Sequence, residues 1–200
     1  MSIYEVFVGA WPYLFEGVQL TLLLTVISII TGTIIAIFLS LGKTYGPKYV
    51  KWPITAFIEL IRGTPLLAQL FILYFGLPPY GIKLSGFLVA YIGFTVNCSA
   101  YTAEYLRGSI MSIESNQLRV AQSLGMTKWQ GIFQIILPQA LRRVVPSWTN
   151  EFIYLLKYTS LAYLIGTEEL MAQAKFFAGR NFEYFKVYLI AAFIYLLIVL

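Results

Sequence analysis

Long apolar runs with few charges are the feature that most constrains the fold of this 200-residue chain. Hydrophobic residues make up 59% of the sequence and charged residues 12%, which lies outside the range of soluble globular proteins. The runs are continuous and do not alternate with polar residues, so they predict membrane-spanning helices and not the strands of a barrel. The backbone N–H and C=O groups of such helices bond to one another, because the bilayer interior offers them no hydrogen-bond partners.

The expected fold class is an all-α integral membrane protein with about five transmembrane helices of roughly 20 residues each. Residues 1–200 are expected to form a single transmembrane domain. The apolar run at the end reaches Leu200 without a basic tail, so we expect the native chain to continue for one or two turns. The predicted spans are approximately 17–41, 54–76, 86–110, 146–165 and 184–200.

Basic residues predict the orientation of these spans. They concentrate after the first span, at Lys43, Lys48 and Lys51, and again around the segment of approximately 112–138. Loops on the opposite side mix basic and acidic residues. The positive-inside rule therefore places the N-terminus outside and the C-terminus in the cytoplasm. Because topology accounts for the net charge of +5, we do not expect nucleic-acid binding.

Several kinds of chemistry are excluded by composition. The chain has no histidine and one cysteine, Cys98, which removes histidine proton relays, His-activated nucleophiles and the common zinc sites. Gly42-Lys43-Thr44 is similar to the end of a phosphate-binding loop, but Ile37 stands at the place of the first glycine. The tripeptide also ends a helix, whereas a phosphate loop opens one. We therefore expect no nucleotide or other cofactor in this chain.

Glu151 is the most informative ionisable residue, because ionisable groups inside membrane spans are costly and mark functional sites. Its helical neighbours three and four residues away include no cation. The carboxylate must therefore face a cavity, a bound ligand or a cation on another helix, or else be protonated. Arg62 and Arg107 are the candidate cations from other helices.

Asn97, Tyr101 and Glu104 follow one another at i, i+4 and i+7 and form one polar stripe. Lipid would leave Asn97 unsatisfied, so the stripe is expected to face the interior of the bundle. It forms either a hydrogen-bonded seam between helices or the lining of a translocation path. The rings of Tyr101 and Tyr158 are also candidates for holding a cation over their faces.

Two carboxylates precede arginines by three residues, Glu59 before Arg62 and Glu104 before Arg107. This spacing predicts neutralising pairs near the cytoplasmic interface, with direct substrate contact as the alternative.

Pro65, after Gly63 and Thr64, predicts a kink in the second span, because proline removes a backbone hydrogen bond. The released carbonyls and the Thr64 hydroxyl would then be available to polar groups.

A stripe of small residues in the first span predicts close approach of another helix. This neighbour belongs either to the same chain or to a second copy. The stripe consists of Ser28, Gly32, Ala36 and Ser40.

The segment Asn116–Pro138 resembles the loop signature EAA-x3-G-x9-I-x-L-P of permeases in binding-protein-dependent ABC transporters. Ala121, Gly125, Ile135, Leu137 and Pro138 stand at pattern positions, whereas Arg119 occupies the place of the acidic residue. Residues 57–69 and 100–108 are similar to the second and third spans of the polar amino-acid permeases, including those for histidine, arginine and glutamine. Residues 137–142 and 150–161 are similar to the sequence that enters and fills their fourth span.

This resemblance implies a type I importer fold in a prokaryotic inner membrane. It implies two permeases (a second copy or a close paralogue), two cytoplasmic ATP-binding subunits that carry ATP and Mg²⁺, and an extracellular binding protein. The chain itself would be a transport subunit and not an enzyme. Arg119, Ala121, Leu124, Gly125 and Met126 would form the coupling helix that docks on the ATPase.

The expected substrate is a polar L-amino acid, and Glu151 favours a basic one such as arginine, lysine or histidine. Asn97, Tyr101, Glu104, Thr64 and Tyr158 complete the predicted substrate-binding set. A polar neutral amino acid such as glutamine is the nearest alternative. A secondary transporter or channel subunit is the alternative from a different class, and transport without ATP would favour it.

Overall fold

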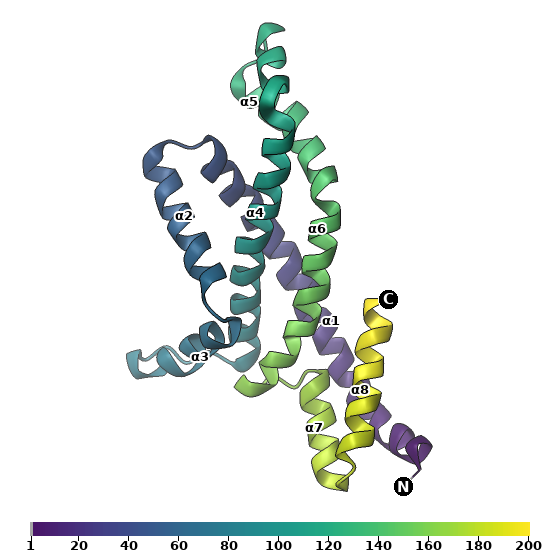
Figure 1. The fold of residues 1–200 in the computed structure, drawn as a ribbon. Helices are drawn as coiled ribbons and strands as arrows, with labels where there is room; N and C mark the ends of the chain where they lie inside the picture. The colour runs from purple at the N-terminus through teal and green to yellow at the C-terminus, as the bar shows by residue number, and fades with distance from the viewer. Residues whose placement is uncertain (1) are drawn as a thin grey trace. The chain divides into compact units, whose positions relative to one another are not determined.

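The chain is helical over nearly its whole length in the computed structural model (Figure 1). The structure describes residues 2–200, apart from the side chains of 114–116, so Asn116 at the start of the predicted loop signature lies outside the described side chains. No β-strand occurs within residues 2–200. The elements are α1 (Ile3–Tyr45), α2 (Lys48–Gly63), α3 (Leu66–Gly76), the 3₁₀ turn η1 (Pro78–Tyr80), α4 (Gly86–Ser123), α5 (Lys128–Gly131), the π-helical η2 (Ile132–Ile136), α6 (Leu137–Tyr158), the 3₁₀ segment η3 (Thr159–Ile165), α7 (Leu170–Asn181) and α8 (Tyr184–Val199).

These helices form two compact units, each of which has its own packing. The terminal unit contains Met1–Ile29, Pro65–Phe94 and Ile153–Leu200, and the central unit contains Ile30–Thr64 and Thr95–Phe152. The long helices α1, α4 and α6 are each divided, with one segment in the terminal unit and another in the central unit.

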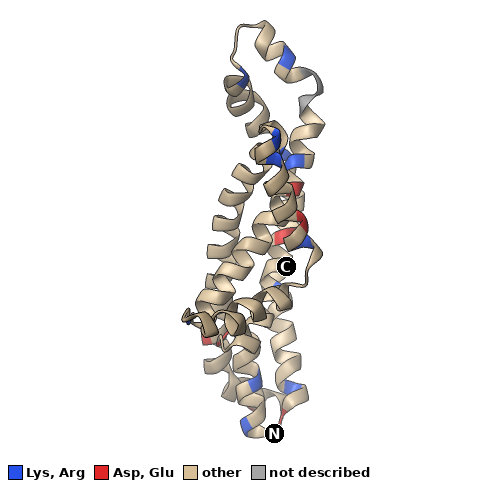
Figure 2. Cartoon of the chain, turned by 90° about the vertical axis from the view of Figure 1, so that its left-hand side faces the viewer, with Lys and Arg blue, Asp and Glu red and all other residues tan. Residues whose placement is uncertain are grey.

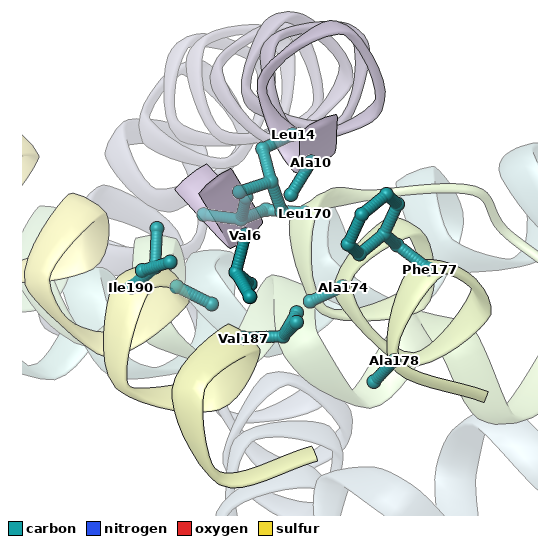
Figure 3. Close-up of a cluster of buried hydrophobic side chains, with 10 residues drawn as sticks. Val6, Ala10, Leu14, Leu170, Ala174, Phe177, Ala178, Val187 and Ile190 are labelled. Carbon is teal, nitrogen blue, oxygen red and sulfur yellow. The ribbon is translucent and has the colours of Figure 1, made fainter. Parts of the chain in front are cut away.

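The core of the terminal unit joins α1, α7 and α8 (Figure 3). Its side chains recur at intervals of three and four residues along each helix, which places them on one face. Gly17 allows α1 to approach α7, because a Cβ atom there would lie 2.6 Å from the Leu170 Cα. The buried residues are Val6, Ala10, Leu14, Leu170, Ala174, Phe177, Ala178, Val187, Ile190 and Ala191.

In the central unit, the small-residue stripe of α1 packs against α4 of the same chain. A Cβ atom on Gly32 would lie 2.9 Å from the Cys98 sulfur and 3.1 Å from the Thr95 carbonyl oxygen. Ala36 is fully buried and shares a cluster with Ala100 and other residues of α4. The neighbour that the sequence left open is therefore an intrachain helix.

The kink expected in the second span is a complete break. α2 ends at Gly63 and α3 begins at Leu66, while Thr64 and Pro65 between them have extended backbones. The segment predicted as a kinked span over 54–76 is therefore two helices with a sharp bend between them. Proline cannot donate a backbone hydrogen bond, and it disfavours helical geometry at the residue before it, which explains the position of the break.

The other predicted spans map onto helices with wider bounds. Residues 17–41 lie inside α1 and 86–110 inside α4, while 146–165 covers α6 and η3, and 184–200 corresponds to α8. By length and composition, α1 is able to cross a membrane, and α2 with Leu66–Tyr80 meets the same criterion as a broken span. The remaining three spans stay predictions.

The predicted coupling segment is a helical hairpin and not an isolated short helix. α4 continues to Ser123 and ends in a Schellman motif, in which Gly125 has a φ of 88° and the Met126 N–H donates to the Ala121 carbonyl. The returning helix then starts at α5. It then passes through the π-helical η2, which ends shortly before Pro138. Proline has no backbone N–H, so it interrupts the regular series of α-helical hydrogen bonds there.

Helix packing at Gly32 gives a direct test of the α1–α4 contact. We expect Gly32→Ala to lower the stability of the protein by about 1–3 kcal/mol, because the new methyl group meets Cys98 and the α4 backbone. The measurement is thermal unfolding of the detergent-solubilised protein.

The matched control is Gly108→Ala on α4, where an added Cβ atom meets nothing within 4 Å. This substitution should be neutral, or stabilising by up to about 1 kcal/mol through helix propensity. Equal unfolding temperatures for the two variants would contradict the close packing.

Candidate functional site

The polar stripe of α4 is present in the central unit, and its three members have different environments. Asn97 is only 4% exposed, whereas Tyr101 and Glu104 are half-buried. Among the described residues, the Asn97 amide has no hydrogen-bond partner. A buried amide without partners costs free energy unless water or a ligand satisfies it. Asn97 is therefore the member of the stripe that most needs an external partner.

Glu104, in contrast, is compensated by two cations. Arg107 donates to it through Nε at 3.1 Å and through Nη2 at 2.9 Å, which confirms the expected pair on α4. The Lys43 ammonium at the end of α1 lies 2.7 Å from the other carboxylate oxygen. The lysine of the Gly42-Lys43-Thr44 sequence thus binds a carboxylate, and Glu104 ties α1 to α4.

Arg62 is held by an aromatic ring. Its guanidinium carbon lies 5.1 Å from the centre of the Tyr101 ring, a cation–π arrangement between α2 and α4. The Tyr101 hydroxyl also donates to the Arg62 carbonyl at 3.5 Å, a long contact. The sequence had assigned Arg62 to Glu59 on its own helix, whereas the structure pairs it with α4.

Among the carboxylates of the central unit that the structure describes, Glu151 is the most deeply buried, at 3% exposure. It accepts a hydrogen bond from Tyr105 and interacts electrostatically with Arg62. It also lies close enough to Cys98 to interact with it, which places Glu151 against α4 beside the residue that follows Asn97. Of the alternatives left open for Glu151, a cation on another helix is therefore supported, and this cation is Arg62. The hydrogen bond from Tyr105 was not predicted from the sequence.

The last two predicted substrate-binding residues lie elsewhere. The Thr64 hydroxyl is exposed at the end of α2 and donates to the Leu60 carbonyl at 2.8 Å, which satisfies one of the carbonyls released at the break. Tyr158 belongs to the terminal unit, where its ring stacks on Tyr154 at 6.3 Å.

The predicted coupling residues occupy the end of α4 and the turn of the hairpin. Arg119 is exposed, Ala121 is buried against Gly131, and Met126 is half-buried behind the turn at Gly125. Leu124 is 78% exposed. Figure 2 shows basic positions along this hairpin. The exposed side chains of Val120, Leu124, Trp129 and Phe133 add an apolar surface there.

A further buried carboxylate, Glu169, lies in the terminal unit. It caps α7 by accepting the N–H groups of Met171 and Ala172, and it accepts the Tyr195 hydroxyl at 2.9 Å. The neighbouring Leu170 N–H donates to the Thr21 hydroxyl of α1. Burial raises the pKa of Glu169 from 4.5 to about 6, although these hydrogen bonds oppose the shift. No sequence pattern singles out Glu169 within its acidic loop.

Neither a metal-binding cluster nor the cavity beside the hairpin provides a better candidate site. Among the described residues, no group of three or more His, Cys, Asp or Glu side chains is placed to hold a metal ion. A cavity of about 480 Å³ in the central unit lies beside the hairpin, where Gln117, Gln139 and Arg142 line it. The polar groups around Glu151 therefore remain the candidate site.

The chain has clear relatives. Residues 28–200 match the family described as binding-protein-dependent transport system inner membrane component. The probable amino-acid ABC transporter permease protein YckA of Bacillus subtilis is 41% identical over 94% of this chain and 83% of that protein. The L-cystine transport system permease protein TcyB of Bacillus subtilis is 39% identical, with coverage of 94% and 81%. The glutamine transport system permease protein GlnP of Escherichia coli is 34% identical, with coverage of 96% and 88%.

The fold has solved counterparts. A structure described as an amino acid ABC transporter with histidines has a TM-score of 0.92 and 34% identity, and covers 100% of this chain and 92% of that one. An inward-facing MetNI methionine ABC transporter has a TM-score of 0.74 at 20% identity, with coverage of 93% and 91%.

The raised pKa of Glu169 predicts a pH-dependent stability. A carboxyl group with a higher pKa in the folded state stabilises the protein most below pH 4.5 and loses this contribution as the pH rises through 6. The rise of the pKa from 4.5 to about 6 corresponds to a loss of about 2 kcal/mol. We expect Glu169→Gln to remove this dependence, as measured by unfolding of the solubilised protein from pH 4.5 to neutrality.

The exposed neighbour Glu168 provides the control, because Glu168→Gln should retain the wild-type pH profile. Parallel profiles for wild type and Glu169→Gln would show that Glu169 does not titrate in this range.

Proposed function

The chain belongs to the family of binding-protein-dependent transport system inner membrane components, and from this premise we propose that it forms the translocation path for a basic L-amino acid. It is a permease subunit of an amino-acid ABC importer with the type I permease fold. ATP hydrolysis takes place in partner chains, and the secondary-transporter and channel alternatives are set aside. The proposal concerns the substrate and the residues that recognise it.

Glu151 is the residue on which the proposal rests. Its carboxylate is buried, and its described partners are one hydroxyl and an arginine beyond direct ion-pair distance. A substrate cation would provide the direct charge compensation that Glu151 lacks. Asn97, buried on the adjacent part of α4 and without a partner, would bind an ammonium or carboxylate group of the same molecule.

The balance of charges in this region favours a basic substrate. Glu151 is buried and interacts with Arg62 without a direct ion pair, whereas Glu104 is neutralised by Lys43 and Arg107. A basic amino acid brings a cationic side chain that would give Glu151 a direct counter-charge. A neutral side chain would leave Glu151 without one, at a cost that grows with burial.

Glutamine is the second candidate. The relative GlnP is named for glutamine transport, and the Asn97 amide is well suited to a polar neutral side chain. Other relatives are named for cystine or for amino acids in general, so the names alone do not decide between the two.

Both Glu151 and Asn97 are buried in this structure, so we infer that substrate reaches them when the helices separate during transport. The importer assembly that we propose contains this permease, a second copy or close paralogue, two ATP-binding subunits with ATP and Mg²⁺, and an extracellular binding protein. The N-terminus would lie outside a prokaryotic inner membrane and the C-terminus in the cytoplasm.

The α4–α5 hairpin is the proposed contact with the ATPase. Its exposed apolar side chains, among them Leu124, suit a protein interface, and Arg119 adds a positive charge where the loop signature has an acid. We infer that Arg119 prefers an acidic patch on its partner.

Replacement of Glu151 tests the substrate assignment. We expect Glu151→Gln to lower uptake of L-arginine by about 10- to 100-fold, because a hydrogen-bonded charge pair contributes about 1.5–3 kcal/mol. L-glutamine uptake should change little. The measurement is ATP-driven uptake of both labelled amino acids into proteoliposomes that contain the complete importer.

Glu16→Gln, an exposed carboxylate substitution in the terminal unit, is the control and should transport like the wild type. Unchanged L-arginine uptake by Glu151→Gln would overturn the basic-substrate assignment, and uptake of L-glutamine alone by the wild type would favour the second candidate.

Gly125 tests the proposed coupling role. Its φ of 88° is unfavourable for branched side chains, so Gly125→Val should disrupt the turn at a cost of about 1–2 kcal/mol. We expect the rate of transport and the rate of stimulated ATP hydrolysis both to be about five- to thirtyfold lower, while amino-acid binding is unchanged. Gly125→Asn, which tolerates this conformation better, should retain most activity. Equal activity of the Val variant and the wild type would contradict the role.

A further inference from the structure

Arg62 occupies a fixed and accessible position in the last turn of α2. Its side chain is exposed, and its guanidinium lies over the Tyr101 ring at 5.1 Å. Stacking on an aromatic face restricts a side chain that would otherwise sample many rotamers. The guanidinium is thus preorganised, although solvent or a ligand can still reach it.

The N–H donors of Arg62 are not taken up by a carboxylate. Among the described residues, ion pairs within 4.0 Å join Glu104 to Lys43 and Arg107 and Glu183 to Lys186, and none includes Arg62. Its interaction with Glu151 is electrostatic and acts over a longer distance. An exposed planar fork with available donors, beside a buried carboxylate, is an incomplete ion pair.

An amino acid has the charges that complete this arrangement. Its carboxylate matches the guanidinium fork through two parallel hydrogen bonds, which an ammonium donor such as lysine does not reproduce. A substrate bound between Arg62 and Glu151 would replace one long interaction by two direct ion pairs. The exposed Arg62 would meet the carboxylate first, and the buried Glu151 would receive the cation.

We propose that Arg62 binds the α-carboxylate of the transported amino acid and that Tyr101 positions its guanidinium; this rests on the proposed function, in which Glu151 binds the substrate's cation. Arg62 is then the determinant that distinguishes amino acids from amines of the same side chain. A purely structural Arg62, which only neutralises Glu151, would make no such distinction.

The test compares L-arginine with agmatine, which is the same molecule without the carboxylate. Binding of labelled L-arginine, and its competition by unlabelled agmatine, would be measured on the permease–ATPase complex in nanodiscs, without binding protein. We expect Arg62→Gln to weaken L-arginine binding by about 10- to 100-fold and to leave agmatine binding within about twofold. Arg62→Lys should restore the affinity only in part.

Three further variants separate the possible results. Glu151→Gln should weaken both ligands, and Arg142→Gln, an exposed arginine substitution on α6, should weaken neither. Tyr101→Leu should weaken L-arginine selectively, since it removes the ring that positions Arg62.

Equal weakening of L-arginine and agmatine by Arg62→Gln would overturn the inference and assign Arg62 a structural role, as would unchanged binding of both. L-arginine binding that is unaffected by Glu151→Gln, or absent from the wild type at saturating concentration, would instead contradict the proposed function. The failures of the two proposals are therefore distinguishable.

Discussion

Carboxylates buried among apolar helices destabilise a protein unless hydrogen bonds or opposite charges compensate them. This chain meets the requirement in three ways. Glu104 has two direct cations, and Glu169 has two backbone N–H groups and a tyrosine hydroxyl. Glu151 has one tyrosine and a more distant arginine. The first two carboxylates connect helices. Glu151 has fewer hydrogen bonds and counter-charges than they have, so it can still bind a cationic ligand. The proposed site is therefore located at Glu151.

Close packing makes this arrangement possible. Gly32 brings α1 into contact with α4, and the Lys43–Glu104 ion pair joins the same two helices further along. These two contacts hold α1 and α4 together, and Glu151 of α6 lies close enough to α4 to interact with Cys98. In the coupling role proposed for the α4–α5 hairpin, its movement would act on the helices that carry Glu151 and Arg62. The break at Pro65 supplies a natural point at which the second span can bend.

Much of this arrangement could be predicted from the sequence, because it depends on local patterns. The helical class, the break beside Pro65 and the Glu104–Arg107 pair all follow from periodicity, proline chemistry and i,i+3 spacing. The loop signature and the matches in three spans indicated the family. The Lys43–Glu104 contact spans 61 residues and could not be predicted, since no single-sequence pattern reports such pairings. The same limit applies to Arg62, for which local spacing favoured Glu59 over the ring of Tyr101. The capping role of Glu169 also depends on tertiary contacts with α1 and α8.

The central claim is that a transported basic amino acid binds to Glu151 in the central unit. Electron cryomicroscopy of the complete importer with L-arginine bound tests it most directly. Density for the ligand is expected with its guanidinium or ammonium group in direct contact with the Glu151 carboxylate and with Asn97 beside it. Ligand density that makes no contact with Glu151 would contradict the claim.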